Sequence, residues 1–214
     1  MKQVKVLVLV CLPFLVSGLF CQETLPNKPK IGILVFGGPT FSNESATQGL
    51  KQAQSKAFRF GFQAGIGCEL PLNDHLAFQF RFVYATGGAV YQYHGFTITW
   101  KENSLEIPVL VKYGFTTGSG PFVLAGIYGG SILSPTTTLN DPATGVTEEE
   151  SIPEDEINKF VYGLVFGGGY EHRFSPLTIF IEATYKLGLS NVQKSELRGA
   201  LRLSAINLTA GIKF

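Results

Sequence analysis

The histidines are the first side chains that could do chemistry, because a histidine can activate a serine nucleophile for attack on an ester. The chain has three of them, His75, His94 and His172. None stands in a recognisable partner motif, and only His94 falls in one of the long polar segments between predicted strands. We therefore predict no catalytic residue. A lipid-modifying enzyme that uses His94 stays as an alternative.

A group of acidic side chains between residues 134 and 158 could offer oxygen ligands to a hard cation such as calcium. Their spacing lacks the alternation of a calcium-binding loop, and the run Glu148 to Glu150 is typical of a solvated surface loop. The sequence therefore predicts neither a metal site nor a cofactor. The acids of this segment are Asp141, Glu148, Glu149, Glu150, Glu154, Asp155 and Glu156.

The overall composition restricts the class of protein. Seventeen Lys and Arg stand against sixteen Asp and Glu, so the basic excess expected of a nucleic-acid-binding protein is missing. Only 15% of the residues are charged and 45% are hydrophobic, whereas soluble proteins carry about 25% charged residues. The chain has too little charge for an ordinary water-facing surface, and we predict no nucleic-acid partner.

The amino terminus has the pattern of a secretory signal peptide. Lys2 and Lys5 precede an apolar run from Val6 to Phe20, which is shorter than the roughly 20 residues that a membrane-spanning helix needs. We expect cleavage after Cys21, a short periplasmic segment at 22–30, and one domain over 31–214. Only Cys68 then remains, so an intramolecular disulfide is excluded.

Apolar and polar residues alternate with a period of two, as in β-strands with one apolar face. In one segment Phe78, Phe80 and Phe82 alternate with Gln79 and Arg81. Six segments follow this pattern, and two Gly-interrupted ones whose facing stays open bring the number of predicted strands to eight. They span residues 58–70, 76–85, 105–115, 160–171, 177–188 and 204–214, with 31–37 and 122–133 as the Gly-interrupted pair.

Short and long connections alternate between these predicted strands. The short ones are 71–75, 116–120 and 175–176, and the long ones are 38–57, 94–104, 134–158 and 190–202. This asymmetry is typical of a transmembrane β-barrel with short periplasmic turns. We predict an all-β fold, an eight-stranded antiparallel up-and-down barrel that is integral to a bacterial outer membrane and has long extracellular loops.

The polar faces of these strands carry ionised side chains of both signs, which suit an enclosed lumen where opposite charges can pair. A lumen of eight strands is about wide enough to be filled by side chains. We predict a lumen ion network of Arg59, Glu69, Arg81, Glu106, Lys112, Glu171, Glu182 and Lys186, with Lys213 on the same faces.

Aromatic residues near the strand ends predict interfacial girdles at both rims of the barrel. The first group belongs to the rim with long loops, and the second to the rim with short turns. They are Tyr91, Tyr93, Phe96 and Trp100, and then Phe115, Phe122, Tyr170, Phe174 and Phe214.

Three motifs resemble those of the PorT-like family of bacterial outer-membrane β-barrels. They are Leu105-Glu-Ile-Pro-Val-Leu-Val-Lys-Tyr113, Ala183-Thr-Tyr-Lys-Leu-Gly-Leu-Ser-Asn-Val192 and the ending Asn207-Leu-Thr-Ala-Gly-Ile-Lys-Phe214. The resemblance implies a Gram-negative outer-membrane location and no catalytic residues. Phe214 and Ile212 resemble the terminal strand that barrel-insertion machinery recognises.

These observations favour a structural or interaction barrel whose lumen is plugged by ion pairs. The expected partners are outer-membrane lipid, lipopolysaccharide, the insertion machinery, and a secretion or envelope complex. A narrow channel for small solutes or ions is one alternative, the lipid-modifying enzyme a second, and a water-soluble lipocalin-like barrel a third.

Overall fold

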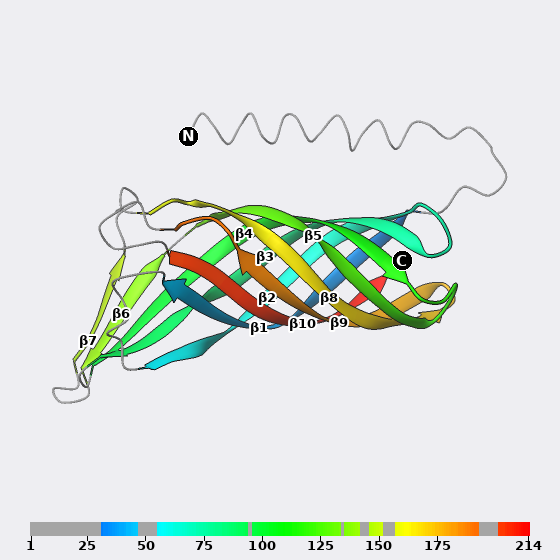
Figure 1. The fold of residues 1–214 in the computed structure, drawn as a ribbon. Helices are drawn as coiled ribbons and strands as arrows, with labels where there is room; N and C mark the ends of the chain where they lie inside the picture. Colours follow the sequence, from blue (N-terminus) through cyan, green and yellow to red (C-terminus); the bar gives the residue numbers. More distant parts are fainter. Residues whose placement is uncertain are drawn as a thin grey trace.

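The chain forms a closed antiparallel β-barrel (Figure 1). The computed structural model describes residues 31–46, 55–93, 96–133, 135–141, 146–151, 157–192 and 201–214. Within these ranges, eight strands form the wall, and the pairings of β1 with β10 and of β3 with β4 close it. The predicted fold class is confirmed. The wall consists of β1 (Gly32–Ala46), β2 (Ser55–Pro71), β3 (Leu76–Tyr93), β4 (Phe96–Gly114), β5 (Gly120–Ile132), β8 (Phe160–Phe174), β9 (Leu177–Gly188) and β10 (Leu201–Lys213).

The two ends of the barrel differ, as predicted. The turns 72–75, 115–119 and 175–176 lie at one end together with Phe214, and we call it the short-turn end; the opposite end is the long-loop end. At the short-turn end Ile33 N donates to Phe214 O at 3.2 Å and Phe214 N donates to Ile33 O at 3.0 Å. The predicted signal peptide 1–21 and the segment 22–30 lie outside the described residues. In the described part of the chain, no helix is long and apolar enough to cross a membrane.

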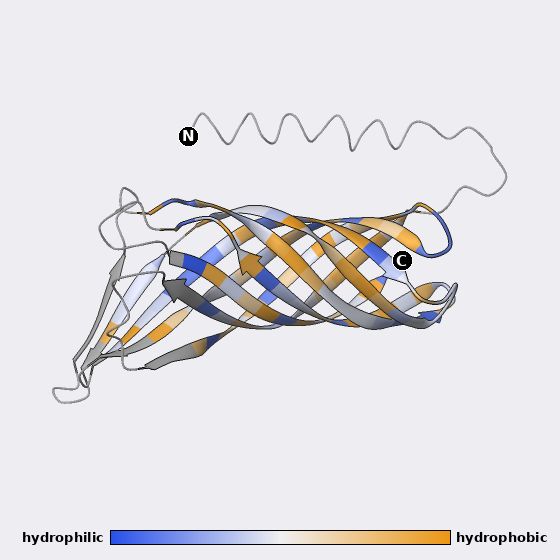
Figure 2. Cartoon of the chain, viewed as in Figure 1, coloured by the Kyte–Doolittle hydropathy of each residue, from blue (hydrophilic) through white to orange (hydrophobic). Residues whose placement is uncertain are grey.

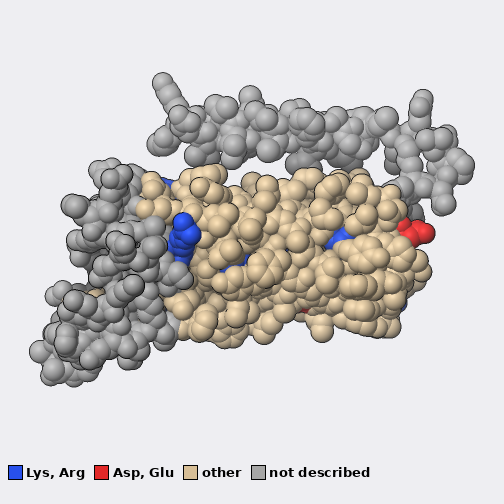
Figure 3. Space-filling model, viewed as in Figure 1, with Lys and Arg blue, Asp and Glu red and all other residues tan. Residues whose placement is uncertain are grey.

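The apolar ladders face outward and the ionised residues face inward. On β3, Phe78, Phe80 and Phe82 are 37%, 41% and 48% exposed, whereas Gln79 and Arg81 are buried. The same alternation makes the outer wall largely apolar (Figure 2) and leaves few charges on the side seen in Figure 3. Because water would not stabilise such a surface, the wall is suited to lipid. The core lies inside the barrel, where it includes Leu34, Phe36, Leu124 and Phe180.

Glycines on β8 give inward-pointing rings room in the lumen. An added Cβ at Gly169 would lie 2.1 Å from Ile181 O and 2.7 Å from Phe122 Cζ, and one at Gly163 would lie 2.7 Å from Tyr128 Cε1. A larger residue at either position would force the neighbouring strand and the ring apart. The glycine-rich stretch of β8 is therefore explained by close packing.

At the long-loop end, the strands continue beyond the predicted bounds. The segment 94–104, predicted as a loop, belongs mostly to β4, which pairs with β3 from Phe96 onward. The predicted loop 38–57 is likewise shortened by β1 and β2. The alternation stops there because the outward positions of β4 become polar at Lys101 and Asn103, although the backbone ladder continues.

Two further strands lie in the segment predicted as the acidic loop 134–158, so the prediction of loop throughout was wrong. β6 (Thr136–Asp141) pairs with β4 over Thr97–Lys101, and β7 (Val146–Ser151) pairs with β6. Residues Ser104–Gly114 of β4 pair with β5 instead. The hairpin thus extends the sheet past the barrel wall at the long-loop end (Figure 1). The sequence did not predict this hairpin, because the three consecutive Glu residues on β7 have low strand propensity.

Two of the predicted girdle aromatics face the lumen instead. Trp100 is 6% exposed and Phe122 is 3% exposed, since both occupy inward positions of the alternation on β4 and β5. Phe115, Tyr170, Phe174 and Phe214 are exposed near the short-turn end, as predicted. The side chains of Tyr91, Tyr93 and Phe96 lie outside the described ones.

Candidate functional site: the charged lumen

Charged side chains from six strands enter the lumen. In the described part of the chain, five acids and five bases lie on the inward faces, and eight of them form three groups along the barrel. The acids and bases are Glu69, Glu102, Glu106, Glu171, Glu182, Arg59, Arg81, Lys112, Lys186 and Lys213. The described lumen residues therefore have balanced formal charge.

Four of these residues form a network at the short-turn end, which we call the inner quartet: Glu69, Lys112, Glu171 and Lys213. Lys112 Nζ lies 3.1 Å from Glu69 Oε2 and 2.5 Å from Glu171 Oε2. Lys213 Nζ lies 2.6 Å from Glu69 Oε1 and 3.1 Å from Glu171 Oε2. Each ion thus contacts two of opposite sign, and strands β2, β4, β8 and β10 are tied together across the lumen.

The middle group is a bidentate ion pair between Arg81 on β3 and Glu182 on β9. Arg81 Nη1 and Nη2 lie 2.5 Å and 2.8 Å from the two oxygens of Glu182. Gln79 accepts from Arg81 Nη2 at 2.6 Å and donates to Glu69 Oε2 at 2.7 Å, so it connects the pair to the inner quartet. The guanidinium also lies 5.0 Å from the ring centre of Phe36. Bonded side chains therefore cross the middle of the lumen.

The outer group centres on Glu106 of β4. Its Oε1 accepts from Lys186 Nζ at 2.5 Å and from Ser104 Oγ at 2.9 Å. The ammonium lies 5.2 Å from the ring centre of Tyr128. Of the predicted network residues, the structure thus brings seven into ion pairs and leaves out Arg59, which is only half-buried and donates through Nη1 to Gly87 O.

Glu102 was missed from the sequence although it lies inside the lumen. It is 7% exposed, and its Oε2 has no hydrogen-bond partner. The prediction ended this strand at Leu105. Continuing the parity of Glu106 and Ser104 by one more step would have placed Glu102 in the lumen.

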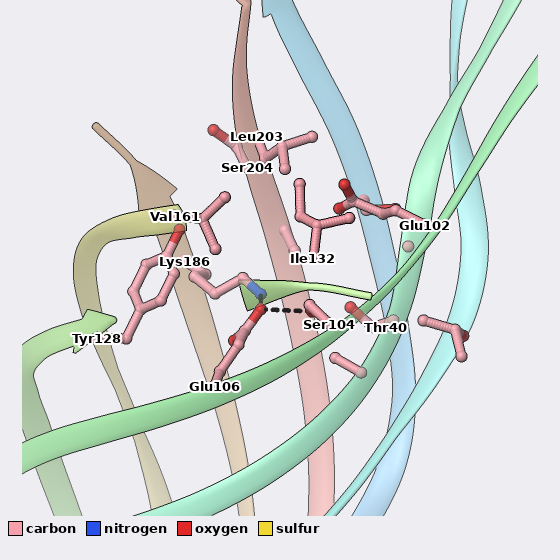
Figure 4. A pocket seen from close by; sticks show the side chains of 15 residues that line it. Thr40, Glu102, Ser104, Glu106, Tyr128, Ile132, Val161, Lys186, Leu203 and Ser204 are labelled. Atoms are coloured by element: carbon pink, nitrogen blue, oxygen red, sulfur yellow. Dashed lines mark hydrogen bonds and ion pairs between the residues drawn. The ribbon is translucent and has the colours of Figure 1, made fainter. Parts of the chain in front are cut away.

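Two small cavities lie beside the outer and middle groups. One of about 20 Å³, which we call the outer cavity, is bordered by Glu102, Glu106 and Lys186 (Figure 4). The other, of about 30 Å³, is bordered by Arg81, Glu182 and again by Glu106 and Lys186. Each has room for about one water molecule. The ion pair of Glu106 and Lys186, which we call the outer pair, therefore lies between two polar cavities.

The remaining candidate residues lie away from the lumen. His75 stacks on Tyr113 at 5.9 Å between ring centres, and His172 makes an edge contact with Phe174 at 4.4 Å. Phe214 and Ile212 are 60% and 38% exposed on the outer face. His94 lies outside the described residues. Within the described ranges, no three His, Cys, Asp or Glu side chains are grouped to hold a metal ion.

A family model and one solved structure agree with this architecture. A family model described as "Outer membrane protein beta-barrel domain" matches residues 22–194. No curated protein matches the chain. Among solved structures, OprG from Pseudomonas aeruginosa is similar at a TM-score of 0.52 and 11% identity, over 90% of this chain and 99% of that one. Neisserial surface protein A is similar at 0.47 and 15%, over 85% and 95%. Ail of Yersinia pestis is similar at 0.45 and 15%, over 87% and 100%.

Proposed function

This chain belongs to the outer membrane protein beta-barrel domain family and is an integral outer-membrane protein, and we propose that it serves as a structural or interaction barrel without enzymatic activity. In this proposal ion pairs and packed rings close the lumen, and the long-loop end contacts a partner or lipopolysaccharide.

Closure of the lumen carries the proposal. The middle pair, Arg81 and Glu182, has side chains only 5% and 1% exposed. Phe36, Phe122 and Phe180 fill the same interior, and an eight-stranded barrel is about as narrow as its side chains allow. The two cavities near the outer pair are too small for a solute larger than water. This packing supports a non-conducting barrel.

A planar-bilayer recording tests closure. We expect the reconstituted wild type to show no stepwise conductance. The Arg81→Ala/Glu182→Ala double variant, which removes the middle pair, is recorded in parallel, and conductance steps in the variant alone would assign the closure to that pair. Conductance steps from the wild type would overturn the proposal.

The interaction role is supported by the extended sheet at the long-loop end. β6 continues the sheet from β4 beyond the wall, and β7 adds a further strand with a Glu run from Glu148 to Glu150. Affinity capture from the source cell and binding to lipopolysaccharide are compared for the wild type and for a variant in which 135–157 is replaced by a short linker. We expect the partner or the lipopolysaccharide to be lost from the variant, and equal retention would contradict this role.

A narrow channel is the second candidate, and one observation favours it. The two cavities share Glu106 and Lys186 as lining residues, so separation of this pair would join them. A wild type that conducts in bilayers would support this candidate, and its conductance should then change in Lys186→Met.

We also propose a PorT-like assignment within the family, supported by the motifs Leu105–Tyr113 and Ala183–Val192. Association with a secretion or envelope complex is the corresponding expectation. The capture experiment tests it, since a barrel recovered alone would speak against such a complex.

A further inference from the structure

Glu102 differs from every other acid in the described part of the lumen because it takes part in no ion pair there. Glu69, Glu106, Glu171 and Glu182 each lie within 3.1 Å of a Lys or Arg nitrogen. Glu102 is equally buried, but its Oε2 has no hydrogen-bond partner. A buried carboxylate without a partner is strongly unfavourable, so the site calls for a positively charged or hydrogen-donating occupant.

Figure 4 shows the Glu102 carboxylate pointing into the outer cavity. The hydroxyls of Thr40, Ser42 and Ser104 lie on the cavity wall. Each already donates a hydrogen bond to another group, at 2.6 Å, 2.9 Å and 2.9 Å. They can therefore act only as acceptors toward the cavity, which is what a cation requires. Their partners are Asn207 Oδ1, Gly88 O and Glu106 Oε1.

The positive charges near the outer cavity are bonded elsewhere. Lys186 Nζ is 2.5 Å from Glu106 Oε1, and Arg59 Nη1 donates to Gly87 O. Both attract Glu102 from a longer distance. Two carboxylates thus border one cavity, and a single ammonium is bonded directly to one of them. With Glu102 ionised, the local deficit is about one positive charge.

We propose that the outer cavity binds one monovalent alkali-metal cation, sodium or potassium, through Glu102. A cavity of about 20 Å³ has room for one ion of water size. Divalent ions fit poorly, because calcium takes about six to eight oxygens and magnesium retains several waters. Glu106 and the hydroxyl oxygens of the wall complete the ligand environment, and the nearby ammonium of Lys186 keeps the affinity for a single charge modest.

The dependence of barrel unfolding in detergent on the cation in solution tests the site. The unfolding midpoint is measured at equal ionic strength in the chlorides of sodium, potassium and N-methylglucamine, the last cation being too large for the cavity. An ion at ten times its dissociation constant raises the folding constant about elevenfold. We expect sodium or potassium to stabilise the wild type and the control Asp74→Asn, whose carboxylate lies in an exposed turn, but not Glu102→Gln.

The same stability in all three salts would overturn the site and indicate a protonated Glu102 or a water molecule instead. Retention of the specific effect in Glu102→Gln would overturn the assignment to Glu102. If Glu102→Gln does not fold, equilibrium dialysis of the wild type tests the site, with radioactive sodium and with rubidium in place of potassium. One ion per barrel for at least one of the two metals supports the site, and no saturable binding of either overturns it.

Discussion

Removing the guanidinium of Arg81 should destabilise the barrel more than removing the whole middle pair. In Arg81→Met, both oxygens of Glu182 lose their partners, while the carboxylate stays in a place where its side chain is 1% exposed. Breaking a buried pair from one side typically costs about 3–5 kcal/mol. Gln79 loses its contacts with the guanidinium as well, which adds about 1 kcal/mol.

The double variant Arg81→Met/Glu182→Leu provides the matched control. Replacing a buried ion pair by apolar groups of similar volume is often close to neutral. We therefore expect the double variant to recover most of the loss, with a coupling energy of about 2–4 kcal/mol in the double-mutant cycle.

Unfolding in detergent with urea, followed by the gel mobility difference between folded and unfolded barrel, measures these free energies. An Arg81→Met variant within about 0.5 kcal/mol of wild type, or a double variant less stable than the single one, would refute the reasoning that a buried, unpaired Glu182 causes the loss.

Three other changes test separate parts of the structure. Phe82→Arg, on the outward face of β3, should cost up to about 2–4 kcal/mol, the range for an arginine at the bilayer midplane, when unfolding is measured in lipid vesicles. Gly169→Val should abolish the folded gel band, since its Cβ would meet Ile181 O at 2.1 Å; a normal band would contradict the close packing described for β8. Lys213→Ala leaves the inner quartet with one ammonium for two carboxylates, and we expect a loss of about 1–3 kcal/mol in urea unfolding, with no such loss in the exposed-site control Asp74→Asn.

The sequence predicted the eight strands of the wall because lipid imposes a strict alternation on them. On β4 that alternation holds from Leu105 to Gly114 and places Glu106 and Lys112 inside. The alternation fails from Phe96 to Ser104, because outward residues that lie beyond the lipid need not be apolar. Glu102 and the inward position of Trp100 were missed for this reason.

Arg59 shows a second limit of the pattern. The pairing of β2 with β3 shifts by one residue between Phe58 and Gln63, although Arg59 keeps the inward parity of its strand. Arg59 follows this irregularity and reaches Gly87 O instead of a carboxylate. Such a bulge depends on local backbone geometry, including Gly88 at a φ of 137°, which the alternation does not encode.

Tryptophan quenching by brominated lipids tests most directly that the apolar ladders contact lipid and that the ionised residues are enclosed. In a Trp100→Phe background, Phe180→Trp and Ile181→Trp place the fluorophore at neighbouring positions of β9, where the native residues are 5% and 59% exposed. We predict strong quenching for Ile181→Trp and little for Phe180→Trp. Equal quenching of the two, or the reverse order, would contradict the account.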